Sequence, residues 1–329
     1  MLSARTQATL LLTGHIPLPG HGKMGLDPAE PLDVREWNRL ARWLSSQQLT
    51  PEDLLGPNAT QILTEWDDER IPTERLRALL DRGHALALVT DRWLGTGMWI
   101  ITRSDPGYPA RLKQHMKDSA PPLLFGYGDH RHFSNRGVAI VGSRDAAEAD
   151  LALAESLGSQ VSAAGCNVIS GGARGVDDRA ARGAFAAEGT VIVVVADSLL
   201  RNGSKPHYLP HLLSGDLVLT TPYSPETGFS AGNAMGRNRL IYCLADAAVA
   251  VSSANGTGGT FSGASQNLRS RWVPLWVAPT EDPASGNSAL VAQGAGWLPS
   301  RDHLEIEPLF TWPTAPEQSS VTPAQATLF

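Results

Sequence analysis

The sequence predicts an α/β protein: a Rossmann-like, doubly wound and mostly parallel sheet with an N-terminal small helical module and a flexible C-terminal tail. Three observations support this fold class. Helical periodicity dominates the early chain, short Val- and Ile-rich runs alternate with helical stretches from Gly137 onward, and the residues after about Ser300 are rich in Pro, Glu, Ser and Thr without periodicity. We place the boundaries at 1–103 for the module, 104–300 for the Rossmann-like domain and 301–329 for the tail.

Composition limits the classes of function. The 329 residues suffice for about two domains, and 42% hydrophobic content supports a proper core. A formal net charge of −6 excludes attachment to DNA by bulk positive charge, so a nucleic-acid site must be a local arginine cluster. Two cysteines form neither a disulfide framework nor a zinc site. Because the sequence has no apolar segment of membrane-spanning length, we expect a soluble, cytoplasmic protein with no membrane contact.

The N-terminal module is expected to be mainly helical. The apolar cluster near the start predicts a first helix rather than a signal peptide. Helical spacing of apolar residues predicts a second helix within Val34–Leu44, and Thr73–Leu80 follows Pro72 with the start signal of a short helix. Short strands are expected at His84–Thr90 and Met98–Thr102. The module is SAM-like or helix-hairpin-helix-like in outline.

The Rossmann-like domain is expected to alternate strands with helices. The expected strands are Val138–Val141, Asn167–Ser170, Val191–Ala196, Leu217–Thr220, Ala247–Val251 and Val273–Ala278. The expected helices between them are Ala146–Ala164, Asp177–Ala187, Ala234–Leu244 and Thr260–Ser270. Continuous apolar strands with helical crossovers are typical of a parallel sheet covered on both faces, with its ligand crevice at the carboxyl ends of the strands.

Glycine-rich turns follow three of these strands, and a fourth element, AMGRNRLIY, begins a helix with two arginines. Because these arginines are two residues apart, we expect them to lie on different sides of the helix. The candidate phosphate-binding residues are Gly142, Ser143, Arg144; Ser170, Gly171, Gly172, Arg174, Gly175, Asp177; Arg237, Asn238, Arg239; and Gly258, Gly259, Thr260. Glycine lets a ligand approach the backbone, a helix N-terminus attracts anions, and arginine binds phosphate in a bidentate manner. A tight turn alone also explains each glycine. Neither a P-loop nor a dinucleotide fingerprint is present, and no cofactor is expected.

Candidate catalysts have simpler explanations. Asp177 and Asp178 lie in the first turn of a helix, where capping and dipole stabilisation account for them. His207 and His211 have metal-compatible spacing but no third ligand nearby, so we expect no metal site. Cys166 and Cys243 are expected to be packed core thiols. The sequence therefore favours a protein without catalytic activity.

The order and the sequences of these loops resemble those of the DprA/Smf family of DNA-processing proteins. The resemblance runs from SDPGYPARL and PPLLFGYG through VAIVGSR, CNVISGGARGVD and GRNRLIYCLADAAVAVSS to WVPLWVAP, a little over half of the chain. It implies a Rossmann-like domain that forms a homodimer, binds single-stranded DNA and helps to load a RecA-type recombinase. It also implies a role in recombination or DNA uptake, and defence against foreign DNA is a related possibility that we include.

Some positions depart from the family pattern. Ala181 stands where a histidine is usual, and GTGGTFSGA is nearer to the phosphate loops of the LOG-like nucleotide-binding superfamily. In the nucleotide-cleaving branch of that superfamily a catalytic glutamate follows the loop, whereas Phe261, Ser262 and Gly263 follow here. The alternative to a DNA-binding protein is thus a nucleotide-binding sensor or nucleotide-processing enzyme. A third hypothesis is a scaffold recruited to replication proteins.

The last five residues resemble the pentapeptide that binds the bacterial sliding clamp. Leu328 and Phe329 would enter an apolar pocket while Gln325 forms a hydrogen bond beside it. The tail docking on its own domain is the alternative.

Overall fold

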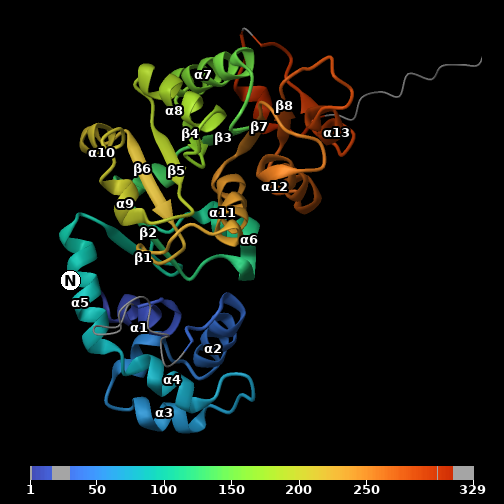
Figure 1. Cartoon of the computed structure of the whole chain (residues 1–329). Helices are drawn as coiled ribbons and strands as arrows, with labels where there is room; N and C mark the ends of the chain where they lie inside the picture. The colour runs from blue at the N-terminus through green and yellow to red at the C-terminus, as the bar shows by residue number, and fades with distance from the viewer. Residues whose placement is uncertain (1, 17–29, 302, 314–329) are drawn as a thin grey trace, which may run out of the picture.

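The computed structural model describes residues 2–16, 30–301 and 303–313 (Figure 1). Its N-terminal part is a cluster of helices with a core of its own, drawn in blue and cyan below the sheet. These helices are α1 (Ala4–Thr13), α2 (Val34–Ser46), the 3-10 helix η1 (Pro51–Leu55), α3 (Ala59–Glu65), α4 (Thr73–Leu80) and α5 (Gly83–Gly95). A capping box formed by Asp33 and Glu36 begins α2. The three helices predicted for this module are confirmed as α1, α2 and α4.

The strand expected at His84–Thr90 is wrong, because these residues belong to α5. Five residues of this helix are buried, and they recur at spacings of one, three and four: Ala85, Leu86, Val89, Thr90 and Trp93. That pattern is typical of one face of a helix, and a continuous apolar run of this length is ambiguous between helix and strand when taken alone.

The rest of the chain is built on a nine-stranded sheet, in the order β1-β2-β6-β5-β4-β3-β7-β8-β9. The strands β1 and β2 pair antiparallel at one edge, and the seven others run parallel. Their bounds are β1 (Trp99–Thr102), β2 (Leu123–Tyr127), β3 (Gly137–Val141), β4 (Asn167–Ser170), β5 (Val191–Val194), β6 (Leu217–Thr221), β7 (Ala247–Ala250), β8 (Leu275–Val277) and β9 (Gly296–Trp297). The Rossmann-like, mostly parallel sheet is confirmed.

Helices cover both faces of the sheet. Alternate residues of β3 face opposite ways: Val138 and Ile140 pack with α7 and α8, whereas Ala139 and Val141 pack with α11 and α12. The remaining helices are α6 (Ala110–Met116), η2 (Lys117–Ser119), η3 (His130–Ser134), α7 (Glu148–Ala163), α8 (Val176–Ala186), α9 (Leu199–Gly203), α10 (Leu209–Ser214), α11 (Ala231–Leu244), α12 (Gly258–Ser270), α13 (Gly286–Val291) and η4 (Glu307–Phe310).

The helices α7 and α8 approach each other closely, because each presents a glycine at the contact. A Cβ on Gly183 would lie 1.8 Å from the Glu155 carbonyl oxygen, and one on Gly158 would lie 2.0 Å from that of Ala180. A methyl group at either place would force the two helices apart.

The boundaries expected from the sequence differ from the structure at both ends of the sheet. The strand β1, which we assigned to the module, belongs to the sheet. Residues 303–313 were assigned to the flexible tail, yet Leu304, Ile306 and Leu309 are buried in the core. In addition, Leu309 accepts a hydrogen bond from the Trp276 indole through its carbonyl oxygen. None of the helices in the described ranges is long and apolar enough to span a membrane.

The direction of chain winding reverses between β3 and β7. From β3 the chain continues through β4, β5 and β6 on one side, and it returns to the other side of β3 as β7 and β8. Ligands of open parallel sheets bind where the carboxyl ends of two such strands diverge. The loops that follow β3 and β7 lie side by side, since the Ser143 amide donates to the Ser252 carbonyl oxygen at 2.9 Å.

Candidate nucleic-acid interface

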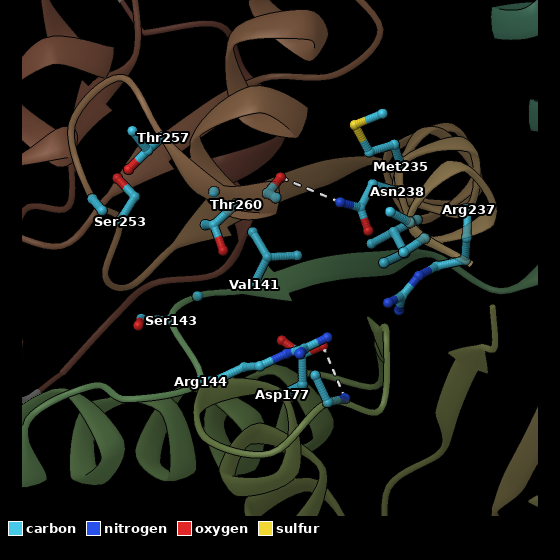
Figure 2. Close-up of a pocket in the computed structure, with 18 of the residues that line it drawn as sticks. Val141, Ser143, Arg144, Asp177, Met235, Arg237, Asn238, Ser253, Thr257 and Thr260 are labelled. Atoms are coloured by element: carbon cyan, nitrogen blue, oxygen red, sulfur yellow. Dashed lines mark hydrogen bonds between the residues drawn. The ribbon is translucent and has the colours of Figure 1, made fainter. Parts of the chain in front are cut away.

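A cavity of about 440 Å³ opens at this reversal point. Residues of five segments line it: the loop after β3, the start of α8 with the residues before it, one side of α11 with the residues before it, the loop after β7 and the start of α12. Figure 2 shows Arg144 and Asp177 at the lower side of the cavity, Thr257 and Thr260 at the upper side, and Arg237 and Asn238 from α11 at the right.

The first backbone amides of α12 receive no side-chain cap from the residues that the structure describes. The side chain of the N-cap residue Thr257 makes no capping hydrogen bond, and the first N–H groups of a helix have no partner within it. Gly256 and Gly258 have φ angles of +69° and +81°, and a Cβ at either position would meet nothing within 4 Å. The Asn238 amide donates to the Gly259 carbonyl oxygen at 3.2 Å and fixes α12 against α11. The first turn thus presents free donors and a partial positive charge to the cavity.

The Arg237 guanidinium lies in a slot at the base of the cavity. The residue is 8% exposed, and its Nη1 donates to the Val194 carbonyl oxygen at 3.0 Å. Gly171 makes room for it, because a Cβ there would lie 1.5 Å from Nη1. Among the described residues, Arg237 Nε has no hydrogen-bond partner. Burial lowers the pKa of Arg237, which indicates a cation short of solvation.

Asp177 is a buried carboxylate that supports the loop between β4 and α8. Its Oδ2 accepts hydrogen bonds from the Gly171 amide at 3.0 Å and from the Ala173 amide at 3.3 Å. Burial raises the pKa of Asp177, although nearby Arg237 and the two amides act in the opposite direction. The Asp177 carboxylate therefore binds amides of its own loop and holds Gly171 beside Arg237.

The two exposed arginines differ in their partners. Arg144 lines the cavity and makes no ion pair with any described residue. Arg174 pairs with Asp145 at 2.8 Å, and the two side chains are 80% and 84% exposed. A pair so exposed contributes at most about 1 kcal/mol, so a phosphate can replace Asp145 at little cost.

The structure brings most of the predicted residues together. Those lining the cavity are Gly142, Ser143, Arg144, Asp177, Arg237, Asn238, Gly258, Gly259 and Thr260. Arg239 does not line this cavity, which agrees with the expectation that the two arginines of this helix face different ways. It lines a neighbouring hollow between α11 and α12 and another hollow that includes residues of the N-terminal module. Ser170 is fully buried, and its hydroxyl accepts from the Gly172 amide at 3.4 Å.

The glycines of the first two loops make room for the protein itself. A Cβ on Gly142 would lie 2.5 Å from Val176 Cγ2, and one on Gly175 would lie 2.5 Å from the Ser143 carbonyl oxygen. A Cβ on Gly172 would meet the Tyr208 hydroxyl at 2.6 Å. The tight-turn explanation therefore accounts for these glycines, whereas the third loop is open toward the cavity.

Sequence reasoning missed twelve of the lining residues, among them Phe229, Met235 and Thr257. Phe229 and Met235 are large and mostly exposed, at 64% and 60%. The available signal was an aromatic residue in the polar segment TGFSAGN directly before the arginine-bearing helix.

Two further hollows adjoin the cavity. One, of about 510 Å³, shares Ala173 and Asp177 with it and continues past Arg174 to Lys205. The other, of about 300 Å³, shares Met235 and Asn238 with it and lies between α11 and α12. The first hollow thus continues the cavity toward α8 and α10, and the second continues it between α11 and α12.

The remaining candidates have packing roles. The His211 ring stacks on Phe185 at 3.5 Å between centroids, and its Nδ1 lies 3.1 Å from Asp216. No group of three metal-ligating side chains occurs in the described ranges. Cys166 and Cys243 are buried, as expected, and burial raises the pKa of both thiols. Gln325, Leu328 and Phe329 lie outside the described residues.

Fold and crevice define the class: a Rossmann-like α/β protein with glycine-rich loops converging at the topological switch point of a parallel sheet. The family model of DNA recombination-mediator protein A matches residues 99–307, well over half of the chain. The protein therefore belongs to this family, and the resemblance to DprA/Smf proteins is confirmed.

Individual relatives agree with this assignment. A DNA processing protein DprA of Mycobacterium tuberculosis is 29% identical over 189 residues, which are 56% of this chain and 49% of the relative. Protein Smf of Synechocystis is 26% identical over 210 residues, which are 62% of this chain and 52% of the relative. The chain thus spans about half the length of the curated relatives it matches.

Two solved structures share the fold. DprA from Streptococcus pneumoniae has a TM-score of 0.56 at 20% identity, covering 69% of this chain and 80% of that one. DprA from Helicobacter pylori, whose structure concerns its single-stranded DNA binding mode, has a TM-score of 0.52 at 23% identity, covering 62% of this chain and 92% of that one.

Proposed function

We propose that this protein binds single-stranded DNA along the carboxyl edge of its sheet and acts in DNA processing without catalysis. The observation that carries the proposal is the cavity at the start of α12, where free helix amides face Arg144 and the buried Arg237. Both kinds of group bind phosphate oxygens.

A strand of nucleic acid fits this edge because the hollows follow one another. The central cavity shares lining residues with a neighbouring hollow on each side. Arg174 and Lys205 lie along one extension, and Arg239 lies along the other. Successive phosphates would therefore meet cations on both sides of the central site, which supports a polymer over a single nucleotide.

The cationic groups are local, since the chain as a whole carries a formal charge of −6. Affinity should therefore depend on a few phosphate contacts and fall steeply with salt. The family membership and the single-stranded DNA binding mode of the H. pylori relative give independent support.

A second candidate function is binding of a free nucleotide. The central cavity of about 440 Å³ is of suitable size for a small phosphorylated ligand, and the GTGGT loop is open toward it. Under this alternative the protein is a nucleotide sensor of the LOG-like kind.

Fluorescence anisotropy of a labelled oligonucleotide across a salt series tests both candidates. We expect preference for single over double strands, with log affinity falling by about 0.7 per neutralised phosphate per log unit of salt. Free mononucleotides should compete only weakly. Absence of binding at low salt, together with thermal stabilisation by a mononucleotide, would favour the sensor instead.

Partners remain part of the proposal. A homodimer and a RecA-type recombinase follow from the family resemblance, and the sliding clamp follows from the C-terminal pentapeptide. Roles in recombination, DNA uptake or anti-phage defence, and a cytoplasmic location, likewise stay predictions.

A further inference from the structure

A hollow of about 340 Å³ lies between the N-terminal module and the sheet. The module lines it with residues at the end of α1, at the start of α2 and in α5. The rest of the chain lines it mainly with β2, the loop after β6 and α11. Among the described residues, none lines both this hollow and the phosphate-binding cavity, so the two are separate.

Much of the lining is apolar and comes from both parts of the chain. Leu32 and Val34 belong to the module, and Leu123 and Phe125 belong to β2. The Trp93 ring of α5 packs edge-on against Phe125 with 5.6 Å between the ring centroids, and both residues line the hollow. Apolar walls of this kind bury the body of a small ligand, while a few polar groups fix its orientation.

The polar groups of the hollow are mainly hydrogen-bond donors. Arg239 is half-buried, and its guanidinium forms no hydrogen bond or ion pair with a described residue. The hydroxyls of Ser224 and Thr227 and the side-chain amide of Asn233 likewise have no partner among the described residues. A guanidinium accompanied by hydroxyl and amide donors is suited to the oxygens of a carboxylate, a sulfonate or a phosphate.

The other titratable groups of the hollow leave Arg239 as its main uncompensated charge. The Asp33 carboxylate accepts hydrogen bonds from two amides in the first turn of α2, where the helix dipole offsets its charge. Burial lowers the pKa of His15 below its usual 6.5, so its ring is neutral at pH 7. Burial raises the pKa of Tyr223, which keeps its proton and donates to the Asn233 carbonyl oxygen at 3.0 Å.

We propose that this hollow binds a small organic anion, with its acidic group on Arg239 and its apolar body between the module and β2. The inference goes beyond the proposed function, because it concerns a separate hollow and a ligand that is not a nucleic acid. Since both parts of the chain contribute walls, the bound anion also stabilises the contact between the module and the sheet.

Two fluorescent probes with the same aromatic body test the site in the full chain. Anilinonaphthalene sulfonate carries an acidic group, whereas phenylnaphthylamine has the same rings without it. A charged hydrogen bond at a half-buried site corresponds to about a tenfold gain in affinity, and we expect the wild type to prefer the sulfonate by this factor. Arg239→Gln should abolish the preference and leave the affinity for the uncharged probe unchanged, with circular dichroism as the check on folding.

Val34→Glu tests the module side of the hollow. Val34 is the first residue of α2, where an acidic side chain is favourable for the helix. The added carboxylate should weaken binding of the sulfonate more than binding of the uncharged probe. Ser45→Glu is the matched control, because it adds the same charge to the same helix at a residue that does not line the hollow.

Two other arginines serve as comparisons for Arg239. Arg201 is exposed on α9, does not line the hollow and forms no ion pair with a described residue. Arg201→Gln should therefore keep the preference for the sulfonate. Arg144 lines the phosphate-binding cavity, which is the rival location for an anionic probe. Arg144→Gln should also keep the preference if the sulfonate binds at Arg239.

Each outcome decides a part of the proposal. Equal affinities of the wild type for the two probes would refute the anion site. A preference lowered by Arg201→Gln or Arg144→Gln as much as by Arg239→Gln would refute it as well. If Val34→Glu has no more effect than Ser45→Glu, the placement between the module and the sheet is wrong. Oligonucleotide binding is measured separately, so each of these failures leaves the proposed function standing.

Discussion

Gly171→Ala isolates the slot that holds Arg237. A Cβ at this position would lie 1.5 Å from Nη1 and 2.5 Å from Cζ of that arginine, so the guanidinium must leave. Its departure breaks the hydrogen bond from Nη1 to the Val194 carbonyl oxygen. A buried hydrogen bond to a charged group contributes about 1.5–3 kcal/mol. We expect a loss of unfolding free energy of this size, because the end of a flexible side chain can move without unfolding the loop.

Urea unfolding measures the loss, and anisotropy with a single-stranded oligonucleotide measures its functional effect. We expect weaker binding with a salt slope shallower by about 0.7, as one phosphate contact is lost. Gly95→Ala is the control, since a Cβ there meets nothing within 4 Å. The double variant Gly171→Ala/Arg237→Ala should be no less stable than Arg237→Ala alone. A Gly171→Ala protein of wild-type stability and affinity would refute the placement of Arg237.

Three further predictions concern the surrounding residues. Asp177→Asn keeps an acceptor for the two loop amides but removes the titrating carboxyl. Because burial raises the pKa of Asp177 above its usual 3.8, the wild type loses stability as the pH rises through the folded-state pKa. Urea unfolding between pH 4 and 7 should therefore show that the stability of the variant increases relative to the wild type toward pH 7. Asp145→Asn should change stability by less than about 1 kcal/mol but strengthen oligonucleotide binding, because it frees the exposed Arg174; unchanged affinity and salt slope would contradict this. Gly183→Ala should destabilise the protein by about 1–3 kcal/mol despite the higher helix propensity of alanine, since its Cβ would lie 1.8 Å from a backbone oxygen of α7; a variant with a raised Tm would disprove this close packing.

Local pattern predicted much of the fold. The helix Thr73–Leu80 and the strand Asn167–Ser170 occur at the expected residues, because a preceding Pro in one case and a short apolar run before glycines in the other mark their limits. The strand predicted at His84–Thr90 was wrong because the apolar residues of this segment fit both the helical and the strand period. Packing against the sheet and α1 selects the helix. Residues 303–313 lack periodicity, so their burial depends on contacts that no local pattern records.

The candidate site was predictable in position but not in detail. Glycines after parallel strands indicated the edge of the sheet at which the cavity lies, and the spacing of Arg237 and Arg239 indicated that they face different ways. The sequence could not show that Gly171 exists to admit Arg237, because the two are far apart in the chain and meet only in the folded protein. The exposure of Phe229 depends equally on tertiary structure.

The central claim is that the cavity between β3 and α12 binds the phosphates of a single strand. The most direct test is the salt dependence of oligonucleotide affinity for the wild type and for Arg144→Ala, because this exposed arginine lines the cavity without an ion-pair partner among the described residues. We predict weaker binding at every salt concentration, with a slope shallower by about 0.7 and unchanged stability. Identical affinity and slope in the two proteins would contradict the claim.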